Sequence, residues 1–332
     1  KEAGQTDAAI KQFQSLIADY PENDMVQEAA YFVGQNQYQS ERWAEAAKSF
    51  EIAAAAGAEN DGGDEGLLEK SLYRLGWSRF KSGDYAGAEA AFGRQYRDVP
   101  AGPLSLDAMM MIGESRFKQN QFETALKAYN KAREKIVADN DSAKTIRDDA
   151  ERQVRELTLL HGGQSAAQLK QWSSAIEWYD ELRQRFPATT YLPQVFYESG
   201  FAYQQAGDEE RALRLYEQVA ESYRNELAAR ARFMMGEIYF AQKQYSKAIP
   251  EFQRVMYGFG AEQATNDIKN WQAKSGFEAG RCAESLVDVA KTESARAKAR
   301  GFAERFYQYV VDRHGDHELA QKAQERLQSI QG

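Results

Sequence analysis

The sequence predicts an all-α protein, specifically an α-solenoid built from successive helix pairs. A 17-residue pattern with helical spacing occurs six times along the chain, and the six copies align with one another without insertions or deletions. Only 6 prolines interrupt 332 residues, which favours helices over strands and turns. Hydrophobic residues make up 43% and charged residues 28%, as is usual for a folded protein. A chain of this kind is expected to form an array in which each element touches its neighbours.

Each 17-residue stretch begins with glycine, has alanine at its thirteenth position and ends with an aromatic residue. We call the first residue the opening glycine and the last the closing aromatic. The opening glycines are Gly34, Gly76, Gly113, Gly163, Gly200 and Gly236; the alanines are Ala46, Ala88, Ala125, Ala175, Ala212 and Ala248; the closing aromatics are Phe50, Phe92, Tyr129, Tyr179, Tyr216 and Phe252. The small residues are expected to let two helices approach closely, while the aromatics fill the space between adjacent pairs.

This pattern resembles the tetratricopeptide repeat, a helix-turn-helix of about 34 residues. The best match is the second repeat, which carries Leu75, Gly76, Gly83, Asp84, Ala88, Phe92 and Pro100. The resemblance implies a right-handed superhelix and makes the opening glycine the eighth place of each repeat. The segments "IKQFQSLIADYP", "MMGEIYFAQKQYSKAIPEFQRV" and "VVDRHGDHELAQKAQERL" are similar to bacterial envelope tetratricopeptide proteins, such as the TolA-binding protein and the outer-membrane assembly lipoprotein. That similarity implies a periplasmic or envelope location, and a cytoplasmic one stays open.

We expect one continuous solenoid over residues 1–332. Its segments are 1–21 (second helix of a truncated repeat), 22–56, 67–100, 104–132 with an extension to about 149, 150–187, 191–224, 227–258, a degenerate repeat at 266–315, and a capping helix at 316–330. The acidic, glycine-rich Ala56–Gly66 is expected to be a mobile loop, and Arg133–Asp149 an extended second helix followed by a turn. Because the chain opens inside a helical pattern, we expect a processed or truncated N-terminus.

The sequence carries no pattern that predicts an enzyme, a cofactor or a metal site. It has no glycine-rich phosphate loop, H-E-x-x-H or G-x-S-x-G. His314 and His317, with Asp312 and Asp316, are expected to form a polar turn rather than a metal site. Cys282 is expected to be a small core residue.

Two further classes are disfavoured by composition. A net charge of −8 offers no excess positive field for nucleic acid. No apolar run approaches the roughly 18 residues of a membrane span, so no transmembrane segment is predicted.

The predicted binding surface is the groove formed by the first helix of each repeat. In tetratricopeptide repeats, the second, fifth, ninth, twelfth and thirteenth places tend to face that groove. The candidate groove residues are Tyr31, Tyr38, Lys70, Tyr73, Arg74, Trp77, Phe80, Met110, Glu114, Phe117, Tyr197, Phe201, Phe233, Glu237 and Phe240. Aromatic anchors with polar neighbours are typical of peptide grooves. The alternative is that the twelfth-place aromatics Tyr38, Phe80, Phe117 and Phe240 pack against the next helix.

Lys70 and Arg74 occupy two places that, in some tetratricopeptide proteins, hold the C-terminal carboxylate of a partner. The other places hold Tyr31, Gln35 and Trp77, so a carboxylate clamp is not expected. The resulting prediction is a non-enzymatic scaffold that binds peptide or helix segments of a protein partner. The alternatives are a structural homo-oligomerisation module and a regulatory region of a larger chain.

Two poor helix formers stand inside predicted helices, Gly236 and Pro250. Gly236 is expected to lie where the second helix of its pair crosses closely. Pro250 has no counterpart in the other repeats. It is tolerable only if its helix starts near Ser246 or bends.

Overall fold

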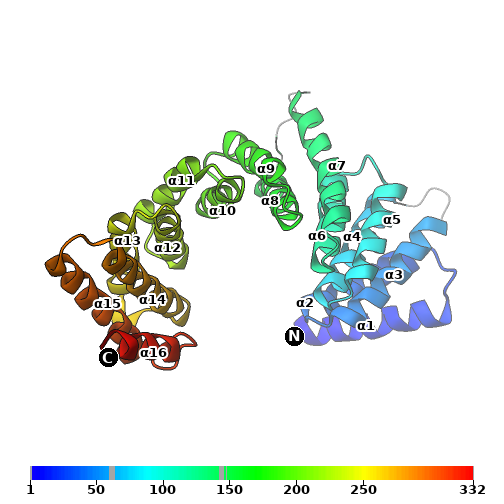
Figure 1. The fold of residues 1–332 in the computed structure, drawn as a ribbon. Coiled ribbons are helices and arrows are strands. Elements are labelled where there is room, and N and C mark those ends of the chain that lie inside the picture. Colours follow the sequence, from blue (N-terminus) through cyan, green and yellow to red (C-terminus); the bar gives the residue numbers. More distant parts are fainter. Residues whose placement is uncertain (1, 60–63, 142–145, 147, 332) are drawn as a thin grey trace. The chain divides into compact units, whose positions relative to one another are not determined.

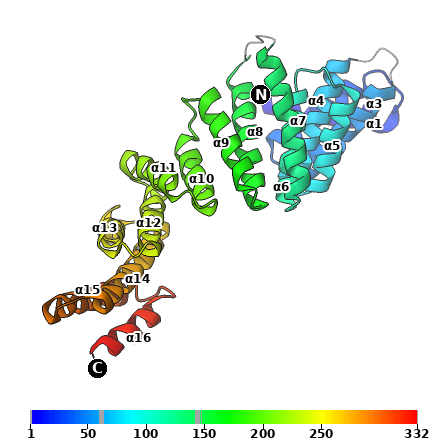
Figure 2. The same ribbon diagram turned by 45° about the horizontal axis from the view of Figure 1, so that its top comes forward.

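The computed structural model describes the chain except for residues 1, 60–63, 142–145, 147 and 332; side chains of residues 2–6, 59, 140 and 141 are also outside the description. The described residues form sixteen α-helices and one short 3-10 helix, η1 (Ala261–Gln263). Contacts divide the chain into two compact units, unit 1 (Lys1–Leu182) and unit 2 (Arg183–Gly332), with the division inside α9. Figures 1 and 2 show the helices of each unit in chain order.

Unit 1 is a row of antiparallel helix pairs. Its helices are α1 (Glu2–Asp19), α2 (Val26–Gln39), α3 (Trp43–Glu59), α4 (Glu65–Lys81), α5 (Tyr85–Asp98), α6 (Ser105–Lys118), α7 (Phe122–Asp141), α8 (Asp149–Gln168) and α9 (Trp172–Arg185). From α1 to α8, each helix contacts the next. The pairs are α2 with α3, α4 with α5, α6 with α7, and α8 with α9.

Unit 2 continues the same alternation. Its helices are α10 (Leu192–Gln205), α11 (Glu209–Ser222), α12 (Glu226–Ala241), α13 (Tyr245–Tyr257), α14 (Asn266–Val289), α15 (Glu293–Arg313) and α16 (Ala320–Gln331). From α10 to α16, each helix again contacts the next. None of the described helices is both long enough and apolar enough to cross a bilayer.

The opening glycine and the closing aromatic of each stretch meet inside the helix pair. A Cβ atom added to Gly236 would lie 2.5 Å from Cε1 of Phe252, and one added to Gly76 would lie 2.6 Å from the ring of Phe92. All six closing aromatics and all six thirteenth-position alanines are fully buried. The expectation for Gly236 is therefore confirmed, and the group that needs the space is the ring of the closing aromatic.

The pair α14 and α15 has the same contact at a longer sequence spacing. A Cβ atom on Gly280 would lie 2.5 Å from the ring of Tyr307, which is fully buried. Gly280 therefore acts as an opening glycine, and Tyr307 as its closing aromatic.

The turn inside each of the six pairs contains one residue in the left-handed region. It stands seven positions after the opening glycine, and these residues are Glu41, Gly83, Asn120, Lys170, Gly207 and Lys243, with φ between 57° and 85°. A left-handed residue commonly ends a helix, and glycine adopts that conformation without a Cβ clash. Only two of the six positions carry glycine.

The segment expected to be a mobile loop is partly helical. The prediction is wrong for Ala56–Glu59, because α3 continues through an alanine run, and alanine is the best helix former. It is also wrong for Glu65 and Gly66, which begin α4. Residues 60–63 lie outside the description. Asp64 then caps α4, its carboxylate accepting from the backbone N–H of Gly66 at 2.9 Å and of Leu67 at 3.2 Å.

The long insertion after the third stretch extends α7 to Asp141, as expected for the second helix. The turn expected after it falls largely on 142–145 and 147, which lie outside the described residues. α8 then begins with a cap in which Asp148 accepts from the backbone N–H of Glu151 at 2.8 Å.

Pro250 lies inside α13, six residues into a helix that begins at Tyr245. The helix therefore starts one residue before the position expected from the proline. Because proline has no N–H, the carbonyl of Ser246 receives no bond from the usual position four residues on. The ring of Pro250 is exposed, so it displaces nothing in the core.

Candidate functional site

The first helices of the pairs form one face of each unit. In unit 1, α2 contacts α4 and α6 contacts α8; in unit 2, α12 contacts both α10 and α14. The described second helices show no comparable contacts between successive pairs. First helices that approach one another this way line the inner side of each row, and we call this surface the first-helix face.

The fifth-place aromatics are partly covered on this face, because each packs against a closing aromatic, and Tyr197 is buried. Ring centroids lie 5.6 Å apart for Tyr31 and Phe50, and 6.2 Å apart for Tyr73 and Phe92. In unit 2 the separation is 5.5 Å both for Tyr197 with Tyr216 and for Phe233 with Phe252. Met110 takes the fifth place of the third repeat and is buried.

The twelfth-place aromatics pack against the next helix, as the alternative interpretation expected. Each meets the aromatic that begins the second helix of its pair, with edge-to-face geometry. The pairs and their centroid distances are Tyr38 with Trp43 (4.7 Å), Phe80 with Tyr85 (5.2 Å), Phe117 with Phe122 (5.2 Å) and Phe240 with Tyr245 (5.5 Å). These rings fix the angle between the two helices of a pair.

In unit 1, the side chains around Trp77 form one connected group. Trp77 lies edge-on to Tyr73 at 6.3 Å and to Phe80 at 5.8 Å. Its Nε1 is buried without a hydrogen-bond partner among the described residues. Arg74 stacks over Tyr38 at 5.0 Å, and Lys70 is exposed. Burial, helped by nearby Asp107, raises the pKa of Tyr73 to about 12, so this hydroxyl stays neutral at physiological pH.

Glu114 is held by one neighbour from the second helix of its own pair and by one from the next first helix. Its carboxylate accepts a hydrogen bond from the hydroxyl of Tyr129 at 2.6 Å and contacts Nδ1 of His161. The His161 ring stacks on Phe117 with an interplanar angle of 24°. Burial, with the Glu114 charge, raises the pKa of Tyr129 well above its ordinary value, so the hydroxyl is a permanent donor.

In unit 2, a cluster of aromatic and cationic groups spans α10, α12 and α14. The guanidinium of Arg230 lies 4.7 Å from the ring centre of Tyr197 and 5.4 Å from that of Trp271. The Lys274 ammonium lies 4.7 Å from Trp271, and Trp271 Nε1 donates to Glu226 at 3.0 Å. Cation–π contacts of this kind hold both partners in a defined orientation.

Beside this cluster, two carboxylates lie near one arginine, which bonds to only one of them. Arg281 donates to both carboxylate oxygens of Glu278 at 3.0 and 2.8 Å, and lies 4.9 Å above the Phe240 ring. Glu237 Oε1 is buried without a hydrogen-bond partner in the described part of the chain. Burial and the nearby Glu278 charge raise the pKa of Glu237 to about 7, although Arg281 opposes the shift.

The face residues of α14 are not among the residues predicted from the sequence. They are Trp271, Lys274, Phe277, Glu278 and Arg281. One signal could have found them: Phe277 precedes Gly280 by three residues, as Tyr31, Tyr73, Tyr197 and Phe233 precede their opening glycines. The ring of Phe277 meets Tyr307 at 5.6 Å, the contact that fifth-place aromatics make elsewhere. Phe201 lies on α10, partly exposed on the same unit.

The remaining chemistry-bearing residues have structural contacts. His314 Nε2 lies 3.2 Å from the Tyr309 hydroxyl, and His317 Nε2 lies 2.9 Å from Asn270 Oδ1. Among the described residues, no group of three or more potential ligands is placed to hold a metal ion. Cys282 is fully buried in the core cluster of unit 2, as expected, and burial raises the pKa of its thiol.

Comparison with known proteins identifies the repeat. The tetratricopeptide repeat model matches residues 1–61, 73–143 and 197–264, more than half of the chain. No curated protein sequence matches this chain significantly. Among solved structures, the C-terminal part of a tetratricopeptide repeat-containing protein from Cytophaga hutchinsonii has a TM-score of 0.60 and 15% identity, and the match covers 88% of this chain and 98% of that one.

Two further structures are similar over a shorter length. The MamA protein has a TM-score of 0.46 and 16% identity, with 60% of this chain and 92% of that chain covered. YrrB, described as a tetratricopeptide repeat protein with an unusual peptide-binding site, has a TM-score of 0.47 and 18% identity, with 66% and 96% covered. The Cytophaga structure supports the fold. The tetratricopeptide repeat model covers more than half of this chain. The chain therefore belongs to the tetratricopeptide repeat family, and its predicted all-α fold of helix pairs is confirmed.

Proposed function

We propose that this protein is a non-enzymatic scaffold that binds a segment of a partner protein on the first-helix face of unit 2. Tetratricopeptide repeats are typically protein interaction modules, which is the support from the family. The observation that carries the proposal is the cluster of Tyr197, Arg230, Trp271 and Lys274 on three successive first helices. All four groups are held in place by one another before any partner arrives.

The chemistry of this cluster suits a protein ligand. Tyrosine, tryptophan and arginine are the residues that most often dominate binding energy at protein interfaces. Their orientation here is fixed by the stacking and by the bond from Trp271 to Glu226, so little side-chain entropy is lost on binding. Next to them, Glu237 has one buried carboxyl oxygen without a partner in the described residues. A donor of a bound segment would reach this oxygen only if the side chain turned outward.

An array of random peptides tests this assignment. We expect the wild-type protein to capture a subset of the peptides, and Trp271→Ala to lose at least tenfold in affinity for that subset. Val289→Ala is the matched control, because Val289 lies on the same helix, is 61% exposed and is outside the cluster. Thermal unfolding of each variant checks that the fold is kept. Equal capture by wild type and Trp271→Ala, or no capture at all, would show that this face is not the binding site.

The first-helix face of unit 1 remains a second predicted surface. Its candidate anchors are Tyr73 and Trp77, whose rings are partly covered by each other and by Phe92. Cross-linking of a partner to the wild type, compared with Tyr73→Ala and Trp77→Ala, tests this surface separately. Unchanged cross-linking in both variants would remove unit 1 from the interaction.

Self-association is the second candidate function, and exposed apolar side chains in α2 and in the segment between α1 and α2 favour it. Tyr20 is 65% exposed, Met25 58% and Phe32 42%. A second copy of the chain could cover these groups. Light scattering over a range of protein concentrations decides the question, since a constant monomer mass at high concentration contradicts self-association.

The envelope location stays a prediction from the resemblance of three segments to envelope tetratricopeptide proteins. Cell fractionation with an antibody against the protein tests it. Recovery with periplasmic or membrane fractions would support the prediction, and recovery with cytoplasmic markers would overturn it.

A further inference from the structure

A cleft in unit 2 is lined mainly by the second helix α13 and by the segments that follow α11 and α13. It has a volume of about 610 Å³, and Arg232 of α12 lies in its wall. Its lining residues are Arg224, Arg232, Pro250, Gln253, Arg254, Tyr257, Gly258 and Phe259. Three of these are arginines and none is acidic. We call it the arginine cleft.

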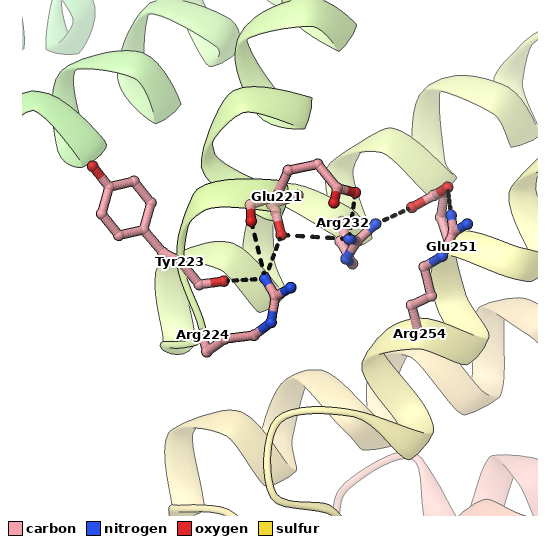
Figure 3. A network of polar contacts seen from close by, with 7 residues as sticks. Glu221, Tyr223, Arg224, Arg232, Glu251 and Arg254 are labelled. Carbon is pink, nitrogen blue, oxygen red and sulfur yellow. Dashed lines mark hydrogen bonds and ion pairs between the residues drawn. The ribbon is translucent and has the colours of Figure 1, made fainter.

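Arg232 is the fixed centre of the cleft. Its side chain is buried and donates to Glu251 at 2.9 Å and to Glu221 at 2.7 Å, so it joins α11, α12 and α13 (Figure 3). The bond to Arg232 lowers the pKa of Glu221, so this carboxylate is ionised under ordinary conditions. A buried arginine with two carboxylates gives the cleft a rigid wall.

The two flanking arginines, Arg224 and Arg254, have fewer carboxylate partners than Arg232. Arg254 contacts Glu251, which Arg232 already shares. Arg224 donates through Nη1 to three backbone carbonyls near the end of α11, of which Tyr223 is the closest at 2.8 Å. Arg224 has no carboxylate partner among the described residues. Three guanidinium groups therefore face two carboxylates, of which Glu251 is buried and Glu221 is 59% exposed.

Hydrogen-bond donors remain for a ligand. In the described part of the chain, Nε and Nη2 of Arg224 and of Arg254 make no hydrogen bond, whereas Nη1 of each is occupied. A guanidinium offers its donors in a planar fork that matches a carboxylate. Figure 3 shows these two side chains on either side of Arg232.

Apart from Gln253, the rest of the lining is apolar or glycine. Tyr257 is 56% exposed, although its ring also meets Tyr309 edge-on at 5.4 Å. Pro250 has a place here, because its exposed ring continues the apolar surface beside Arg254. A volume of this size suits a ligand of several groups, since pockets for ligands of drug size span about 300–1,000 Å³. A single inorganic ion would leave most of it empty.

We propose that the arginine cleft binds an acidic segment of a partner protein, with a glutamate or aspartate carboxylate between Arg224 and Arg254 and an adjacent apolar side chain on Tyr257 and Pro250. The positive excess of the lining and its apolar strip select this ligand. The site is separate from the first-helix face, so one scaffold could hold two protein segments.

A labelled peptide tests the proposal directly. The probe is acetyl-Glu-Glu-Phe-Glu-Glu-amide with a fluorophore, and its partner is the same peptide with glutamine in place of glutamate. Fluorescence anisotropy should show saturable binding of the acidic peptide only, weakening as salt is added. Arg224→Gln and Arg254→Gln should each weaken it about tenfold, the usual effect of losing a charge-assisted hydrogen bond.

Arg214→Gln is the matched control, because Arg214 is an exposed arginine of α11 that pairs with Glu210 outside the cleft. It should bind the peptide like the wild type. Equal binding of the glutamine peptide, undiminished binding in Arg224→Gln and Arg254→Gln, or no saturable binding would overturn the proposal. If inorganic phosphate displaces a weakly bound probe, and a probe without the phenylalanine binds equally well, the result would indicate an adventitious ion only. Loss of binding in Trp271→Ala but not in the arginine variants would place the peptide on the first-helix face instead.

Discussion

Glu114 and Glu237 occupy the same place in two repeats, one in each unit, and have opposite surroundings. Each follows its opening glycine directly, at the ninth place. Glu114 accepts from Tyr129, the closing aromatic of its own pair. The closing aromatic of the other pair is Phe252, which has no hydroxyl, and Glu237 Oε1 has no partner among the described residues.

The neighbouring first helix adds to the difference. In unit 1, α8 brings His161 onto Phe117 and against Glu114. In unit 2, α14 brings Arg281 onto Phe240, but that arginine is already bonded to Glu278. The same repeat position therefore gives a satisfied structural carboxylate in one unit and an unsatisfied one in the other. An unsatisfied buried polar group lowers stability, so Glu237 is expected to cost unit 2 some stability that Glu114 does not cost unit 1.

The largest expected effect comes from breaking the frame that both glutamates share. Gly236→Leu and Gly113→Leu should each lower the free energy of unfolding by about 2 kcal/mol or more, because the new side chain would overlap the ring of Phe252 or Tyr129. Urea unfolding measures the change. Gly301→Ala is the control, since nothing lies within 4 Å of an added Cβ there. An unchanged midpoint for either leucine variant would contradict the role of the opening glycine.

The next effect concerns the satisfied glutamate. Tyr129→Phe removes the 2.6 Å bond to Glu114 while keeping the buried ring. We expect a loss of about 1–2 kcal/mol, because a part-buried carboxylate loses a donor. Equilibrium unfolding of this variant should show it. Tyr85→Phe, at a partly exposed tyrosine, serves as a control for losing a hydroxyl; equal losses in the two variants would mean that the bond to Glu114 contributes nothing.

A pH-dependent effect is expected at the unsatisfied glutamate. Burial and Glu278 raise the pKa of Glu237 from 4.5 to about 7 in the folded state. Between these pH values the folded protein binds more protons at this site than the unfolded chain does, so its contribution to stability falls as pH rises through the window. Glu237→Gln removes this loss. The free energy of unfolding of the variant, relative to that of the wild type, should therefore rise by about 1 kcal/mol between about pH 5 and pH 8, a value reduced to allow for the partial exposure of Glu237.

Urea unfolding of wild type and Glu237→Gln at several pH values checks the sign. Glu217→Gln, at an exposed residue of α11, is the control and should show a flat difference. A gap between wild type and Glu237→Gln that narrows as pH rises would contradict the raised pKa.

The smallest effect would convert one unit to the pattern of the other. Phe252→Tyr places a hydroxyl where Tyr129 has one, close to the carboxyl of Glu237. We expect a gain of up to about 1 kcal/mol and a lower pKa for Glu237, because the new donor favours the ionised form. Carboxyl NMR titration measures the pKa. An unchanged titration would show that the two pairs differ in backbone geometry and not only in this hydroxyl.

Much of the fold follows from residues that repeat at fixed spacing. The close approach of the second helix at Gly236 was predictable from the small residues of the repeat, but its contact with the ring of Phe252 was not, because the closing aromatics were expected between adjacent pairs. The face residues of α14 were missed because its closing aromatic, Tyr307, lies further along the chain than in the other repeats. The helical residues Ala56–Glu59 were missed because nearby glycines outweighed the alanine run.

By itself, the sequence determined the helix pairs, the close helix crossing at the opening glycines and the membership of a repeat family, because these depend on spacing within one repeat. Only the tertiary structure decided which face residues have a partner and which do not, because that depends both on contact with the closing aromatic of the same pair and on side chains from neighbouring pairs. His161 reaches Glu114 from α8, and Arg281 comes beside Glu237 from α14 already paired. The arginine cleft likewise combines α11, α12 and α13, and no pattern along the chain places Arg224 and Arg254 on the same opening.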